Sequence, residues 1–390
     1  MNSDRIFQSA REDGRHQTSL GFCHHLMANH KPKLSFDPNM SIGAFEDWRL
    51  QVRERLTALM GFPEIKVPQP EPKKLWSEPR DGYQLEKWEA YPEPGSVVPF
   101  LMLIPDGVGQ ANPGRTVMCF TGSGQTKELM SGEPELNAQQ PENKHPIRNQ
   151  MAVWYAKAGF VAVAIENPGA GELADGPDLM ASLGRGREKL ATELVLLGRN
   201  YVGFSVFQKQ HILHWLRTLD FVDADRIAVS GHSLGTEPAM VMAVLDEQIK
   251  AFVFNDFLCH TVTRYAAIMR PEDGLWKHTI PLWHLIPGFQ EWLDFPDLLA
   301  AVAPRSLLVT EGGLTRYLDL VGKAYEKTGA RDRYVYHYYP KYQDATDRLH
   351  EYADVPEGLT MEEFFVYANV DAPNHCFKEN LAVPWLDAVL

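Results

Sequence analysis

The segment RIAVSGHSLGTEPAM, residues 226–240, decides the fold. Its apolar first half is typical of a short buried strand, and its second half has the spacing of a helix with one buried face. Between the two, Ser233 stands between glycines in the pattern G-x-S-x-G. A strand, such a turn and a helix in succession predict a nucleophile elbow, which lifts the serine hydroxyl clear of the backbone and directs the N-terminus of the helix at it.

Apolar strands and helices alternate along most of the chain. From about residue 83 onward, short runs such as RTVMCF and VAVAIE are separated by helical patterns. Near-continuous apolar strands that alternate with helices are typical of a mostly parallel sheet with helices on both faces. We therefore expect an α/β catalytic domain over residues 76–390. Residues 1–75 are expected to form a helical extension and a proline-rich connector.

Composition narrows the class of protein. The chain has 390 residues and a formal net charge of -13, which argues against a nucleic-acid partner because phosphate binding needs clustered basic residues. The polar N-terminus and the lack of an apolar run of ~18 residues predict a cytoplasmic protein with no membrane partner. Whether the protein forms a homo-oligomer is left open by the sequence.

The four cysteines are too widely spaced for a CxxC motif, so we expect free thiols. We find no HExxH motif and no Cys/His cluster of ligand spacing, so we expect neither a metal ion nor another cofactor.

The serine needs a base, because at its ordinary pKa it is a weak nucleophile. In this kind of fold the acid and then the histidine follow the serine along the chain. We favour His375, which NVDAPNHCFKENL places in a Pro-Asn turn just before the last expected helix. His350 lies in a charged segment typical of a surface, and His337 alternates within an expected strand, so both are weaker candidates.

The acid has three candidates. Glu311 ends the apolar run RSLLVTEGG, Asp256 ends the preceding strand in FVFND, and Asp319 falls on the helix that follows. A carboxylate at the end of either strand could reach the histidine. We rank Glu311 first, Asp256 second and Asp319 third.

Backbone N–H groups are expected to stabilise the oxyanion. One is that of Leu234, directly after the nucleophile. The other is that of Ser123 or Gly124, in the glycine turn TGSGQTKE that follows an apolar strand.

A cap-like insertion is expected over about residues 260–300. Three of its aromatic residues, Trp276, Trp283 and Trp292, are candidates for the substrate pocket. Tryptophans there could stack on sugar rings or hold an acyl chain, and the alternative is that they pack the cap against the body.

Several stretches of the sequence together resemble the α/β-hydrolases, and more narrowly the bacterial acetyl xylan esterase-like branch, which is related to the cephalosporin-C deacetylases and dienelactone hydrolases. The resemblance rests on GSGQTKE, ENPGAGE, DRIAVSGHSLGTEPAM, KAFVFNDFLCH, LLVTEGGL and VDAPNHCFK, spanning residues 122–378. It implies an α/β-hydrolase fold with Ser233 and His375 as catalytic residues. In the deacetylases the acid is an aspartate at the position of Thr315, so the resemblance leaves the acid of this chain open.

We therefore expect a serine hydrolase that cleaves a carboxylic ester through a Ser-His-acid triad and an acyl-enzyme. The expected substrate is a small-molecule or carbohydrate ester, such as an acetylated sugar. Two alternatives stay open: a hydrolase of a lactone or an amide, and a catalytically silent hydrolase fold used for binding, which Thr315 makes conceivable.

Overall fold

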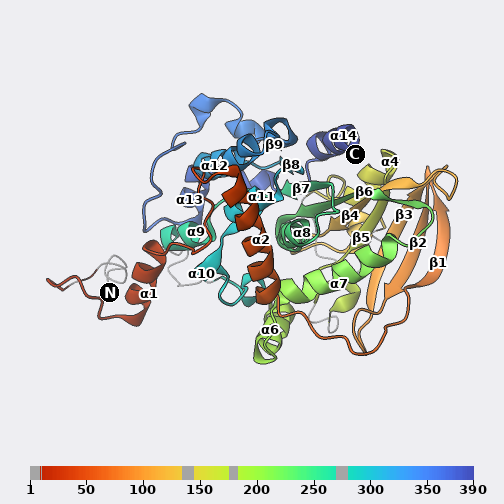
Figure 1. The fold of residues 1–390 in the computed structure, drawn as a ribbon, viewed down its shortest axis with the longest axis horizontal. Helices are drawn as coiled ribbons and strands as arrows, with labels where there is room; N and C mark the ends of the chain where they lie inside the picture. Colours follow the sequence, from red (N-terminus) through yellow and green to blue (C-terminus); the bar gives the residue numbers. More distant parts are fainter. Residues whose placement is uncertain (1–8, 10, 134–144, 175–182, 269–279) are drawn as a thin grey trace.

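A single mostly parallel sheet organises the chain, as Figure 1 shows for the computed structural model, which describes residue 9 and residues 11–133, 145–174, 183–268 and 280–390. The nine strands run in the order β1-β2-β3-β5-β4-β6-β7-β8-β9. The pairs from β1 to β3 and the pair β3·β5 are antiparallel, and β4 to β9 are mutually parallel. The predicted α/β fold class is confirmed. The strands are β1 Lys73–Arg80, β2 Tyr83–Ala90, β3 Val98–Pro105, β4 Gly114–Phe120, β5 Val161–Ile165, β6 Val222–His232, β7 Ala251–Asn255, β8 Ser306–Val309 and β9 Tyr334–Tyr336.

Helices cover both faces of the sheet. The larger apolar core lies between the sheet and α2, α7, α8, α11 and α12, and a second core lies under α4 and α14 on the other face. Both faces of the central strands are therefore buried, which explains their continuous apolar runs. The helices are α1 Ser19–Ala28, α2 Ile42–Leu59, α3 Lys127–Met130, α4 Met151–Lys157, α6 Leu183–Leu196, α7 Tyr201–Leu216, α8 Thr236–Leu245, α9 Thr261–Ala267, α10 Phe289–Trp292, α11 Phe295–Val302, α12 Thr315–Lys327, α13 Met361–Tyr367 and α14 Glu379–Val389.

The strand register brings three strand ends together. His232 at the end of β6 pairs with Asn255 at the end of β7, and Phe254 in β7 pairs with Val309 at the end of β8. Because these strands are parallel, the residues that follow them emerge at the same edge of the sheet. In open α/β sheets this carboxyl edge is where ligands bind.

The N-terminal segment packs onto the main core. Helix α2 of the expected helical extension begins after Ser41, whose hydroxyl accepts a hydrogen bond from the N–H of Ala44 at 3.2 Å. Its buried residues, among them Phe45 and Trp48, belong to the same core as α8. The expected boundary at residue 75 falls inside β1.

Two features of the fold were not predicted. The chain forms two helices, α6 and α7, in place of one continuous helix, because Gly198 adopts a φ of 73° and Asn200 caps α7 by accepting from the N–H of Gly203 at 2.8 Å. Strand β1 lies at the sheet edge and is largely exposed, so it has no apolar pattern that would predict it.

All four cysteines are free, as expected, and only Cys23 is exposed. Among the described residues, no helix combines the length and the apolar composition that crossing a bilayer requires.

Candidate active site

Ser233 occupies the turn between β6 and α8. Its φ is 51°, a left-handed conformation that non-glycine residues rarely adopt. The flanking glycines leave room for close backbone contacts: a Cβ added to Gly231 would lie 2.4 Å from the carbonyl oxygen of Gly235, and one added to Gly235 would lie 2.3 Å from that of Phe120. The turn therefore has the strained geometry of a nucleophile elbow.

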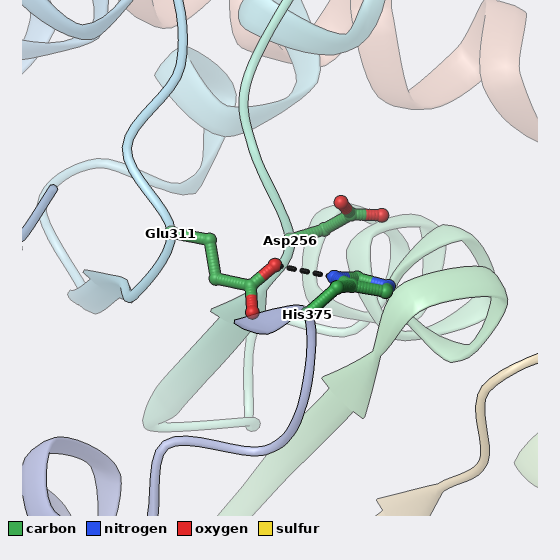
Figure 2. A group of neighbouring side chains, drawn as sticks. All are labelled: Asp256, Glu311 and His375. Atoms are coloured by element: carbon green, nitrogen blue, oxygen red, sulfur yellow. Dashed lines mark hydrogen bonds and ion pairs between the residues drawn. The ribbon is translucent and has the colours of Figure 1, made fainter. Parts of the chain in front are cut away.

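His375 and Glu311 meet at the carboxyl edge of the sheet. The Nδ1 atom of His375 lies 2.6 Å from Oε2 of Glu311 (Figure 2). The hydroxyl of Tyr339 donates to the same oxygen at 2.7 Å. The Lys378 ammonium group and the backbone N–H of Cys376 donate to the other oxygen, Oε1. Both oxygens of this buried carboxylate are therefore held in place.

The charges of this pair reinforce each other. Burial alone would raise the pKa of Glu311, but His375 and Lys378 outweigh it and hold that pKa at about 2. Burial likewise acts to lower the pKa of His375, and the neighbouring Glu311 carboxylate reverses this and raises it to about 9. Glu311 is thus suited to stabilise an imidazolium at His375.

Asp256 lies near the same imidazole without bonding to it. Oxygen atoms of Asp256 and Glu311 and a ring nitrogen of His375 all lie within 4.8 Å of one another. Figure 2 shows the two carboxylates at different sides of the imidazole, and the dashed line joins the imidazole to Glu311 only. Oδ1 of Asp256 instead accepts from the N–H of Phe257 at 2.8 Å. Burial raises the pKa of Asp256 to about 6.

The weaker candidates have other contacts. Asp319 accepts a hydrogen bond from a tyrosine hydroxyl at 3.0 Å, and the ring of His350 stacks on another tyrosine with centroids 3.8 Å apart. His337 directly follows β9, where its N–H pairs with a carbonyl of β8. The Thr315 hydroxyl bonds to that of Tyr338 at 2.7 Å. A carboxylate from the end of β8, four residues before Thr315, thus bonds the histidine instead.

The glycine turn after β4 presents unused backbone donors. The side chain of Gln125 accepts from the N–H of Gly122 at 3.1 Å, while the N–H of Gln125 donates back to the Gly122 carbonyl at 3.3 Å. Within the described chain, the N–H groups of Ser123 and Gly124 form no hydrogen bond. Leu234 lies in the first turn after the nucleophile, where N–H groups lack partners inside the helix. Ser123 and Leu234 line the same cavity as Ser233.

This cavity has a volume of about 550 Å³. Of the three candidate tryptophans, Trp283 lines it, whereas Trp276 lies outside the described residues. Trp292 is not part of the cavity wall; it faces the N-terminal segment, where the guanidinium of Arg55 in α2 lies 3.8 Å from its ring centroid. The cavity wall also contains His375, Asp256, Glu237, His284, Arg264 and Tyr265.

One group of side chains has the spacing of metal ligands within the described ranges: Asp256, Glu311 and His375. Glu311 already accepts four hydrogen bonds, one of them from the Lys378 ammonium group. An adjacent positive charge opposes cation binding. The group is therefore better suited to orient the imidazole than to hold a metal ion.

Sequence reasoning missed the side chains that support these residues. His232 is buried and stacks on His375, with ring centroids 4.8 Å apart, and its Nδ1 lies 3.2 Å from Oε1 of Gln125. Burial, together with the charge of His375, lowers the pKa of His232. The position of His232 within GHSLG was the available signal, whereas Tyr339 and Lys378 carry no motif.

Comparison with known proteins agrees with this geometry. A model of the Abhydrolase family matches residues 1–388. The chain belongs to the α/β-hydrolase family. A Bacteroides fragilis structure that bears the provisional name of acetyl xylan esterase is 40% identical to this hydrolase, with a TM-score of 0.90 and 99% of each chain covered. This places the hydrolase in the acetyl xylan esterase-like branch that the sequence motifs predicted.

More distant structures share the fold alone. A methylesterase is 16% identical, with a TM-score of 0.52, covering 86% of this hydrolase and 66% of that chain. A glucuronoyl esterase from Solibacter usitatus is 14% identical, with a TM-score of 0.50, covering 73% and 81%. No curated protein is significantly similar to the hydrolase.

Proposed function

We propose that this hydrolase cleaves carboxylic esters, with Ser233 as the nucleophile, His375 as the base and Glu311 as the acid. The observation that carries the proposal is the 2.6 Å contact between Nδ1 of His375 and Glu311, beside the cavity that Ser233 and His375 share. A carboxylate at Nδ1 leaves Nε2 of the imidazole to accept the serine proton.

The reaction follows the acyl-enzyme route. His375 takes the proton from the Ser233 hydroxyl as the oxygen attacks the ester carbonyl. The N–H of Leu234 and that of Ser123 or Gly124 stabilise the oxyanion that forms. The imidazolium then protonates the leaving alcohol, and a water molecule activated by the same histidine releases the acid.

For the substrate we propose an acetylated carbohydrate. One support is that the 40% identical relative bears the provisional name of acetyl xylan esterase. The other is the cavity wall, where Nδ1 of His284 lies 2.6 Å from the carboxylate of Glu237, and where Arg264 forms no ion pair within the described chain. Such polar groups can bond sugar hydroxyls, and Trp283 offers a ring for stacking.

The alternatives predict different results. A lactone or amide hydrolase would use the same residues on another carbonyl compound. A silent binding protein would have no need for a carboxylate that holds the histidine, and the hydrogen bond between Glu311 and His375 therefore favours catalysis.

The test is a screen of p-nitrophenyl esters of increasing acyl length and of acetylated xylan oligomers, with two serine variants. Ser233→Ala should lose ester hydrolysis by several orders of magnitude. The matched control is Ser230→Ala in β6, the strand that precedes Ser233, because that buried hydroxyl accepts from Tyr155 at 3.0 Å and does not line the cavity. Preference for acetyl esters is expected. If Ser233→Ala retains more than about a tenth of the wild-type rate, the proposal is wrong.

A further inference from the structure

Arg187 is a buried cation outside the proposed triad. Its side chain projects from α6 and is only 1% exposed. Nη2 donates to the carbonyl oxygen of Ser123 at 3.1 Å, and the guanidinium lies 5.6 Å from the ring of Trp283. Within the described chain it forms no ion pair, and its Nε has no hydrogen-bond partner. A guanidinium remains charged in proteins, so burying one without a counter-charge is costly.

The bond to Ser123 completes a series of contacts along the glycine turn. The side-chain amide of Asn167 donates to the carbonyl of Thr121 at 2.6 Å, and a backbone N–H donates to that of Gly122 at 3.3 Å. Arg187 holds the third successive carbonyl, that of Ser123. Three consecutive carbonyl groups of the turn are therefore fixed by donors from the protein.

Fixing a carbonyl also fixes the N–H of the same peptide. In a trans peptide the C=O and N–H bonds point in opposite directions. The N–H of Gly124 therefore points away from Arg187, and this N–H has no acceptor among the described residues. Ser123 lines the cavity with Ser233, while Arg187 is absent from the cavity wall. The guanidinium thus acts from behind the turn.

We propose that Arg187 is a positioning residue of the oxyanion hole. It orients the Ser123–Gly124 peptide, and its charge polarises that peptide toward the oxyanion. The negative charge that develops on the substrate oxygen supplies the counter-charge that Arg187 lacks in the resting protein. The inference rests on the proposed function, because it assumes that an oxyanion forms beside Ser233.

The experiment measures phosphonylation by a fluorophosphonate, ester turnover and thermal stability in Arg187→Met and Arg187→Lys. In phosphonylation, the Ser233 oxygen bonds to phosphorus, its proton passes to His375, and the P–F bond breaks to release fluoride. The matched control is Arg305→Met, because Arg305 also donates to backbone carbonyls, at 2.9 and 3.0 Å, but these belong to Ile249 and Asp246, which do not line the cavity of Ser233.

We expect Arg187→Met to lower both kcat and the phosphonylation rate by about 10²-fold, as removal of an oxyanion-hole donor does. KM should stay within about twofold, and Tm should not fall, because a buried uncompensated charge is removed. Arg187→Lys should recover part of the rate. Arg305→Met should lower Tm, because three backbone carbonyls lose their donor, and it should leave kcat within about twofold.

Two results would overturn the inference: a wild-type phosphonylation rate in Arg187→Met, or a loss of rate accompanied by a lower Tm and reversed on cooling. Failure of the proposed function looks different. In that case the wild-type protein itself would neither react with the fluorophosphonate nor hydrolyse esters, and the assignment of an oxyanion hole would be refuted as well.

Discussion

Replacing Glu311 by glutamine removes the charge that opposes His375 and retains the size of the side chain. The pKa of His375 is about 9 against an ordinary value of 6.5, and each pKa unit corresponds to about 1.4 kcal/mol. Stabilisation of the imidazolium is therefore on the order of 3 kcal/mol, or roughly 10² in rate. A glutamine NH₂ group facing Nδ1 would also favour the wrong tautomer, for which a loss of roughly 10⁴ is known in a related triad.

We therefore expect Glu311→Gln to lower kcat by roughly 10²–10⁴, measured on a p-nitrophenyl ester. The matched control is Asp256→Asn, because Asp256 lies near the same imidazole but bonds to the N–H of Phe257. Its effect should be within about tenfold. If Asp256→Asn is the crippling change and Glu311→Gln is mild, the acid follows β7 and our assignment is wrong. If both are mild, the chain works with a Ser-His dyad.

Four other predictions follow from the same structure. The value of kcat/KM should rise with pH and level off above about 9, because only neutral His375 can take a proton, and a plateau reached already near 6.5 in a pH–rate profile would refute this. In urea unfolding at several pH values, His375 should contribute to the free energy of unfolding below about pH 6.5, and this contribution should be lost as the pH rises through 9. Glu311 should contribute above about pH 4.5, and its contribution should be lost as the pH falls through 2. Glu311→Gln should weaken both trends. Gly235→Ala should abolish ester hydrolysis, since its Cβ would lie 2.3 Å from the carbonyl of Phe120, whereas Gly109→Ala, with no atom near its Cβ, should have wild-type rates. Dialysis against EDTA should leave the rate unchanged, and loss with recovery on added zinc would contradict the absence of a metal requirement.

The fold could be predicted because its signals are local. The apolar runs of β4 to β8 and the G-x-S-x-G turn are properties of neighbouring residues, and the structure confirms both the parallel sheet and the strained turn at Ser233. Strand β1 gave no such signal, because it is largely exposed at the sheet edge.

The site was only partly predictable, because its contacts join distant segments. Placing Glu311 at a strand end anticipated its contact with His375, although its catalytic role remains a prediction. Lys378 and Arg187 carry no motif, and their contacts depend on how α14 and α6 pack. Trp292 was a candidate for the substrate pocket because it lies in the expected cap, but it packs against Arg55 of α2. An aromatic residue in such a segment can face the body of the protein as well as a cavity.

The central claim is that an acyl group passes through Ser233. The most direct measurement is mass spectrometry of the protein quenched in acid during turnover of p-nitrophenyl acetate, with the modified peptide located by fragmentation. We predict one acetyl group per protein, carried by Ser233, and none in Ser233→Ala. Turnover that persists in Ser233→Ala, or an acetyl group carried by another residue such as Cys259 in the same cavity, would contradict the account.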